Sequence, residues 1–204
     1  SLYPEPPGNG MKERRLFIFV EGNDDERFFS RIVKPLFSDR FSSVEIVMFA
    51  CMKNEKVNSF IRSIGEMGHD FIMCADIDQE PNVLTKKRRL NERYDLFADD
   101  HFIIIVREIE SWYLAGLDER AQHRLGIRRY GSTNHITKEL FNGMIPRHYK
   151  SRIAFMSDII TLFSTHEARE RNRSFSYFCH RYHLLPEETN ADTLSRAPET
   201  EEQS

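Results

Sequence analysis

The sequence predicts an α/β fold in which a four-stranded, mainly parallel sheet is flanked by helices. In the first half, short runs of aromatic and β-branched residues alternate with longer amphipathic stretches, the pattern of strand–helix–strand units. The composition, 40% hydrophobic and 30% charged, is typical of a globular domain. The longest apolar run, FIIIV, is far too short to cross a bilayer, so we expect no membrane partner.

The strands and helices are predicted in alternation. Strands are expected at residues 15–20, 44–50, 71–75 and 101–106. Helices are expected at residues 24–37 and 56–67, where apolar residues recur at the spacing of one buried helix face. A third, very basic helix is expected at residues 83–94. Because strands that alternate with helices are connected by right-handed crossovers, this order favours a parallel sheet.

The second half of the chain is predicted to be helical. Helices are expected at residues 110–116, 137–142, 151–163 and 165–182. We find no internal repeat, no second strand-rich region and no linker between two cores. The expected organisation is a flexible leader at 1–14, one domain at 15–183 (sheet core 15–118, helical portion 119–183) and a disordered acidic tail at 184–204.

Charge is unevenly distributed along the chain. Residues 119–183 contain twelve Lys and Arg against five Asp and Glu, an excess of +7 in a chain whose net charge is −3. A basic portion beside an acidic one suits a protein that holds a metal next to a polyanion, although a solvated helical face gives the same count.

The three cysteines indicate the compartment. They are widely spaced and form no CxxC pair, and the first residues lack the order of a signal peptide. The reducing cytoplasm is therefore the expected location.

Acidic side chains stand at three predicted strand ends. Glu21 follows the first strand, Asp76 and Asp78 end the third, and Glu108 and Glu110 follow the fourth. Parallel strands end at one edge of the sheet, where open α/β folds bind ligands, so these carboxylates are expected to converge. Oxygen ligands without His or Cys favour Mg²⁺ or Mn²⁺. The spacing does not choose between Glu108 and Glu110.

Some of these acids have a simpler explanation. Asp24 and Glu26 open a predicted helix, where a negative charge complements the helix dipole, and we prefer that interpretation for both. Glu21 is harder to explain in this way, because it directly follows a buried strand and precedes Gly22.

The segments LFIFVEGNDD and FIMCADIDQEP resemble a Toprim domain, the metal-binding module of topoisomerases, bacterial primases and OLD-family nucleases. More narrowly, VEGNDDERFF, VREIESWYLAG, IPRHYKSRIA and RNRSFSYF are similar to a Toprim-like bacterial family, related to the OLD nucleases, that is often associated with defence genes. The resemblance covers residues 16–182 and implies a Rossmann-like core.

The resemblance also implies roles for individual residues. Glu21 matches the Toprim glutamate that acts as metal ligand or general acid/base, and Asp76 and Asp78 match the metal-binding pair. Glu110 matches the acidic residue after the last core strand and would be a further metal ligand. Asp25 would support the metal site. The cofactor would be Mg²⁺ or Mn²⁺. The chain has no Walker A sequence, so any ATPase would be a separate chain.

The leading hypothesis is metal-dependent cleavage of DNA or RNA phosphodiesters. Glu21, Asp76, Asp78 and Lys150 are the expected catalytic residues. The expected nucleic-acid contacts are Lys150, Arg152, Arg147, Arg173, Lys86 and Lys87. For the run at 86–89, an ordinary solvated helix face is an equally good interpretation. Trp112 suits base stacking, but core packing is the preferred interpretation.

Two rival functions remain open. The first is a non-catalytic or partner-activated nucleic-acid-binding subunit that works with a separately encoded ATPase. The second is a nucleotide phosphatase, ranked lowest because the haloacid-dehalogenase pattern places its Asp-x-Asp after the first strand, and here it follows the third.

Overall fold

Four short strands form the centre of the fold. The computed structural model describes residues 13–94 and 101–184. Its strands are β1 (Arg15–Val20), β2 (Ser43–Met48), β3 (Asp70–Asp76) and β4 (Phe102–Ile105). Their order is β2-β1-β3-β4 and every pairing between them is parallel. The predicted α/β class is confirmed, and the four strands are parallel throughout.

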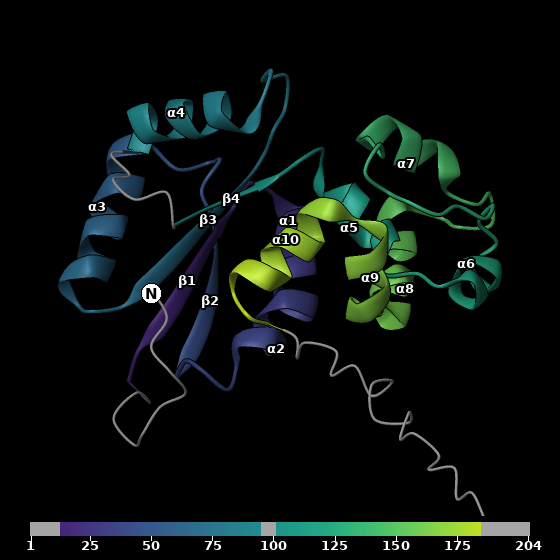
Figure 1. Cartoon of the computed structure of the whole chain (residues 1–204), viewed down its shortest axis with the longest axis horizontal. Helices are drawn as coiled ribbons and strands as arrows, with labels where there is room; N and C mark the ends of the chain where they lie inside the picture. Colours follow the sequence, from purple (N-terminus) through teal and green to yellow (C-terminus); the bar gives the residue numbers. More distant parts are fainter. Residues whose placement is uncertain (1–12, 95–100, 185–204) are drawn as a thin grey trace, which may run out of the picture.

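The side chains of β1 alternate between two separate apolar clusters. Leu16, Ile18 and Val20 belong to the larger cluster, whereas Phe17 and Phe19 belong to the smaller one. Because both faces of the sheet are covered by helices, the strand is buried on both sides and reads as a continuous apolar run. Figure 1 shows the helices on the two sides of the sheet.

The smaller cluster lies beneath α3 (Asn54–Glu66) and α4 (Val83–Tyr94). The larger cluster lies beneath α1 (Asn23–Phe28), η1 (Phe29–Val33) and α2 (Lys34–Phe37) and the C-terminal helices. The first three replace the single helix predicted at residues 24–37. The π-helical turn η1 comes just before Pro35, which has no N–H to continue the regular helical hydrogen bonding.

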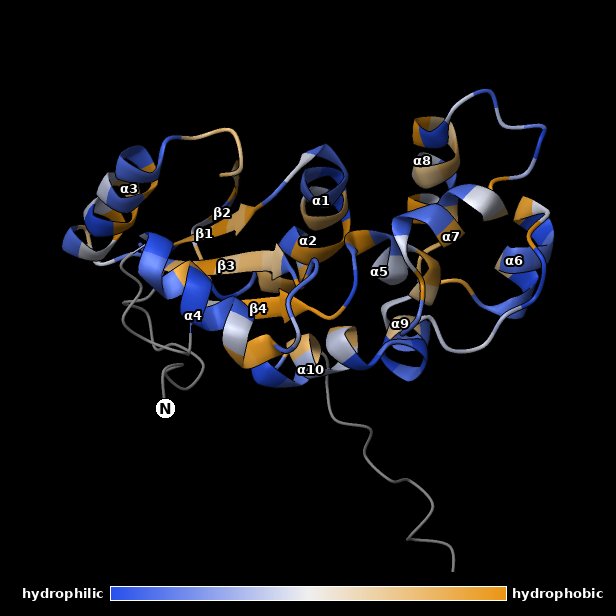
Figure 2. Ribbon diagram, turned by 90° about the horizontal axis from the view of Figure 1, so that it is seen from above, coloured by the Kyte–Doolittle hydropathy of each residue, from blue (hydrophilic) through white to orange (hydrophobic). Residues whose placement is uncertain are grey.

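The C-terminal portion is helical, as predicted. Its helices are α5 (Ile109–Ala115), α6 (Glu119–Leu125), α7 (Lys138–Met144), α8 (Arg152–Leu162), α9 (Thr165–Arg171) and α10 (Arg173–Arg181). Figure 2 shows α6, α7, α8 and α9 beyond the arrowheads of the strands, whereas α10 lies along the sheet. The part of the basic portion that forms α6 to α9 therefore lies beyond the edge at which the strands end.

Two details of this portion differ from the prediction. The single helix expected at 165–182 is divided at Asn172, whose Oδ1 accepts a hydrogen bond of 3.0 Å from the N–H of Phe175 and so begins α10. Helix α6 was not expected. Asp118 caps its start, and Gly126, with φ 78°, ends it in the left-handed conformation.

Other expectations concern the chain ends and the membrane. The leader expected at 1–14 and the tail expected at 184–204 lie outside the described residues, except for Glu13, Arg14 and Leu184. Within the described residues, no helix has the length and apolar content needed to span a membrane.

Candidate metal centre

Three carboxylates meet at the carboxyl edge of the sheet. Glu21 directly follows β1, Asp76 is the last residue of β3, and Asp78 lies two residues further along. Each offers an oxygen, and these oxygens lie within 4.8 Å of one another. They come together because β1 and β3 are paired in parallel, so that their ends are neighbours.

The loop after β3 places Asp78 in a tight turn. The N–H of Glu80 donates to the carbonyl oxygen of Ile77 at 3.1 Å, and the N–H of Ile77 donates to that of Ile105, also at 3.1 Å. Asp78 has φ 52°, in the left-handed region that Asp tolerates better than most residues. A backbone outlier of this kind is often found where a side chain is positioned for function.

Burial and nearby negative charges disfavour the ionised form of Asp76 and Glu21. Burial, and then the nearby charges of Asp25, Glu21, Glu110 and Asp78, raise the pKa of Asp76 to about 9. Burial, followed by the charge of Asp78, also raises the pKa of Glu21. A divalent cation would compensate for the repulsion between these groups.

Asp76 also has an orphaned atom. Its Oδ1 is buried and has no hydrogen-bond partner among the described residues, which is costly for a polar atom. A hard cation would satisfy that oxygen, and the all-carboxylate donor set suits Mg²⁺ or Mn²⁺. The residues present therefore fit the expected metal.

Asp25 lies beside the three carboxylates. It is 8% exposed, and its Oδ2 accepts a hydrogen bond of 3.3 Å from the N–H of Gly22. Burial, followed by the charge of Glu21, raises its pKa to about 7. This placement suits the expected supporting role, but Asp25 does not belong to the group of oxygens within 4.8 Å.

Glu108 and Glu110, between which the sequence spacing did not choose, have different surroundings in the structure. The carboxylate of Glu108 accepts a hydrogen bond from the N–H of Lys138, at the start of α7. Glu110 is 4% exposed, and its charge helps to raise the pKa of Asp76. Glu110 is thus the neighbour of the site, although its oxygens lie outside the group formed by Glu21, Asp76 and Asp78.

Arg152 was expected to contact nucleic acid, and in the structure it joins two acids. Its guanidinium pairs with Glu110 and with Asp24. Asp24 also pairs with Arg27 at 2.9 Å, so its charge does more than complement a helix dipole. In this arrangement Arg152 ties α8 to α5 and α1.

For the run at 86–89, nucleic-acid contact and a solvated helix face were equally good interpretations. For Lys86 the solvated helix face is wrong. Lys86 is 9% exposed, and its Nζ lies 2.5 Å from Oδ2 of Asp78. The sequence contained a signal for this position: Lys86 precedes the buried Leu90 and Tyr94 at intervals of four, so all three share the inner face of α4. Lys87 is partly exposed.

The remaining predicted nucleic-acid contacts lie on the surface. Lys150 and Arg147 are exposed, and their side chains have no hydrogen bond or ion pair with the described residues. Arg173 is exposed at the start of α10. Trp112 is fully buried and donates to Oγ of Ser174 at 2.8 Å, so it belongs to the core.

We compared the chain with protein-family models and with solved structures. No family model and no solved structure matches it. The resemblance to Toprim proteins therefore depends on the sequence motifs alone.

Proposed function

We propose that this protein is a Toprim-like, Mg²⁺- or Mn²⁺-dependent nuclease that hydrolyses nucleic-acid phosphodiesters. The observation that supports this best is the meeting of Glu21, Asp76 and Asp78, with oxygens within 4.8 Å of one another. A buried oxygen of Asp76 without a partner adds to it. Buried, mutually repelling carboxylates lower the stability of a fold, so this cluster is hard to explain by stability alone.

The chain's own residues have separable tasks in this proposal. Glu21, Asp76 and Asp78 would hold the cation, and Asp25 and Glu110 would add negative charge behind them. A cation held there would supply Lewis acidity toward a phosphoryl oxygen and a water molecule.

The position of the basic residues favours a polyanionic substrate. Residues 119–183 carry the +7 excess, and the helices α6, α7, α8 and α9 within them lie beyond the sheet edge that carries the carboxylates (Figure 2). A DNA or RNA strand bound across these helices would approach the candidate metal centre. Lys150, Arg147 and Arg173 remain proposed contacts to its phosphates.

One observation favours a second candidate, a subunit activated by a partner such as a separately encoded ATPase. Two of the acids are already paired with cations, Asp78 with Lys86 and Glu110 with Arg152. A partner that loosened these ion pairs would release both carboxylates. Such a subunit would bind metal and nucleic acid and cut only in the presence of its partner.

The test is cleavage of mixed DNA and RNA substrates with Mg²⁺ or Mn²⁺. We would compare the parent with Glu21→Gln and with Glu55→Gln, which removes an exposed carboxylate from α3 as a control. Cleavage that needs the metal and is lost only in Glu21→Gln would support the nuclease. Equal cleavage by all three proteins would show that Glu21 is not needed for cleavage and would contradict the proposed metal centre.

Calorimetric titration with Mn²⁺ completes the experiment. We expect Asp76→Ala to weaken Mn²⁺ binding, and unchanged binding would remove Asp76 from the ligands. Strong Mn²⁺ binding by a parent that does not cut would favour the partner-activated subunit.

A further inference from the structure

A polar pocket adjoins the candidate metal centre. It has a volume of about 530 Å³, within the range of ligand sites, roughly 300–1,000 Å³. It is lined by Asp78 and Glu80 from the loop after β3, and by Lys86, Arg89, Leu90, Glu92 and Arg93 from α4. Asp78 belongs to both the pocket and the carboxylate cluster, so the two sites are contiguous.

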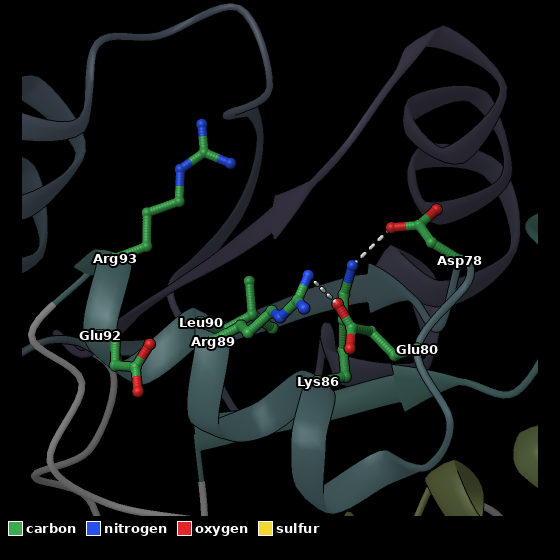
Figure 3. A pocket seen from close by; sticks show the side chains of 7 residues that line it. All are labelled: Asp78, Glu80, Lys86, Arg89, Leu90, Glu92 and Arg93. Carbon is green, nitrogen blue, oxygen red and sulfur yellow. Dashed lines mark hydrogen bonds and ion pairs between the residues drawn. The ribbon is translucent and has the colours of Figure 1, made fainter.

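Three cations of the pocket share one face of α4. Lys86, Arg89 and Arg93 are three and then four residues apart, which places them on the same side of the helix. Figure 3 shows Lys86 and Arg89 reaching across from α4 to the loop carboxylates. Lys86 lies 2.5 Å from Asp78, and Arg89 lies 2.6 Å from Glu80.

We propose that this pocket binds a backbone phosphate of the nucleic-acid strand, next to the bond that is cut, and that Lys86 is its principal contact. This inference rests on the proposed function. A cation bound by Asp78 competes with Lys86 for the same carboxylate. Lys86 is only 9% exposed, so its ammonium then needs another anion in the same place, because an unpaired buried charge is costly. A phosphate oxygen of the substrate meets that need.

This exchange couples the two ligands. Metal binding would release Lys86 for phosphate, and phosphate binding would draw Lys86 away from Asp78. Each ligand should therefore strengthen binding of the other, by the same factor in both directions.

The lining selects the phosphate rather than the base. Leu90 is the single apolar residue of the lining, and no aromatic ring contributes to it. A base needs an aromatic or apolar face on which to stack. The pocket therefore contacts the sugar–phosphate backbone, which makes its binding independent of sequence and dependent on salt.

The test measures binding rather than cleavage. Fluorescence anisotropy would give the affinity of the full chain for a labelled single-stranded oligonucleotide, DNA in one series and RNA in another. Each series is run without metal and with Mn²⁺ on an oligonucleotide with phosphorothioate linkages, which resist hydrolysis, and a gel checks that it stays intact. Lys86→Gln is compared with Lys56→Gln, which removes an exposed lysine of α3. Thermal melts confirm that both variants fold.

We expect Lys86→Gln to weaken binding about tenfold in Mn²⁺ and to reduce the salt dependence by about 0.7 of a slope unit for a single strand. Lys86→Arg should restore part of the affinity, and Lys56→Gln should stay within about twofold of the parent. Competition by inorganic phosphate as strong as that by unlabelled oligonucleotide would identify a free-phosphate site and overturn the assignment to the strand.

The outcomes separate this inference from the nuclease itself. A parent that binds Mn²⁺ and cuts, while Lys86→Gln binds the oligonucleotide as the parent does, would overturn the pocket and leave the nuclease. A parent that binds no Mn²⁺, yet holds the oligonucleotide through Lys86, would overturn the nuclease and leave the phosphate site.

Discussion

Asp76 differs from an ordinary surface carboxylate in two ways. One of its oxygens is buried without a partner, and burial with four acidic neighbours raises its pKa to about 9. In the unfolded chain the same carboxyl titrates near 3.8. Because the folded protein retains a proton that the unfolded chain releases, this group contributes stability at low pH that is lost as the pH rises through about 9.

This difference predicts how the metal-free protein responds to pH. With a chelator present, the parent should become less stable from about pH 5 to pH 9, and Asp76→Asn should be more stable than the parent at pH 8. The shift is about 2–4 °C for each kcal/mol in a chain of this size. Thermal melts followed by circular dichroism across this range check it. A melting temperature of the parent that does not change between pH 5 and pH 9 would contradict the raised pKa of Asp76.

Added Mn²⁺ should make the parent more stable than Asp76→Asn, the reverse of their order without metal. A ligand at 100 times its dissociation constant stabilises the folded state by about 2.7 kcal/mol. The parent should gain this stabilisation, whereas Asp76→Asn should gain much less because it lacks one carboxylate of the proposed ligand set.

At the scale of elements, Arg152 joins parts of the chain that are distant in sequence. It is the first residue of α8, and its guanidinium pairs with Glu110 in α5 and Asp24 in α1. The carboxylate of Glu110 is only 5% exposed. Removal of Arg152 would therefore leave a buried charge without its partner.

We expect Arg152→Gln to lower the free energy of unfolding by about 3 kcal/mol, near the lower end of what breaking a buried pair costs. Urea unfolding measures this, with Arg128→Gln, which changes an exposed arginine, expected within about 0.5 kcal/mol of the parent. The double variant Arg152→Gln/Glu110→Gln should recover part of the loss, because it removes the orphaned charge. If the double variant lost as much stability as the single variants Arg152→Gln and Glu110→Gln together, a direct interaction between the two side chains would be excluded.

For the molecule as a whole, one apolar cluster connects the sheet to the helical portion. It contains Ile18 and Ile72 of the strands together with Trp112, Phe155 and Phe178 of the C-terminal helices. The opposite face of the sheet has its own, smaller cluster beneath α3 and α4. Since the strands contribute to both clusters, disruption of either one disturbs the sheet that the other requires.

This arrangement predicts a single cooperative unfolding transition. Trp112 is the only tryptophan and is fully buried, so its fluorescence reports on the larger cluster. Its midpoint in urea should coincide with that of the far-ultraviolet circular dichroism of the whole chain. An earlier fluorescence midpoint would mean that the helical portion unfolds independently of the sheet.

Local sequence signals were sufficient for the fold class and for the acidic site. The expected strands lie within two residues of the observed ones, because each is an apolar run bounded by polar residues. Glu21, Asp76 and Asp78 converge because each is tied in sequence to a strand end, and parallel strands end at one edge. The additional helix α6 and the break at Asn172 were missed because both depend on short capping signals within polar segments.

The partners of the charged groups were decided by tertiary structure. Lys86 meets Asp78, Arg152 meets Glu110 and Asp24, and Glu108 meets the backbone of α7. The two residues of each Arg152 pair lie 42 and 128 positions apart in the chain. Hydrophobic periodicity specifies which side of a helix or strand faces inward, but the packing of those elements determines which charges meet there.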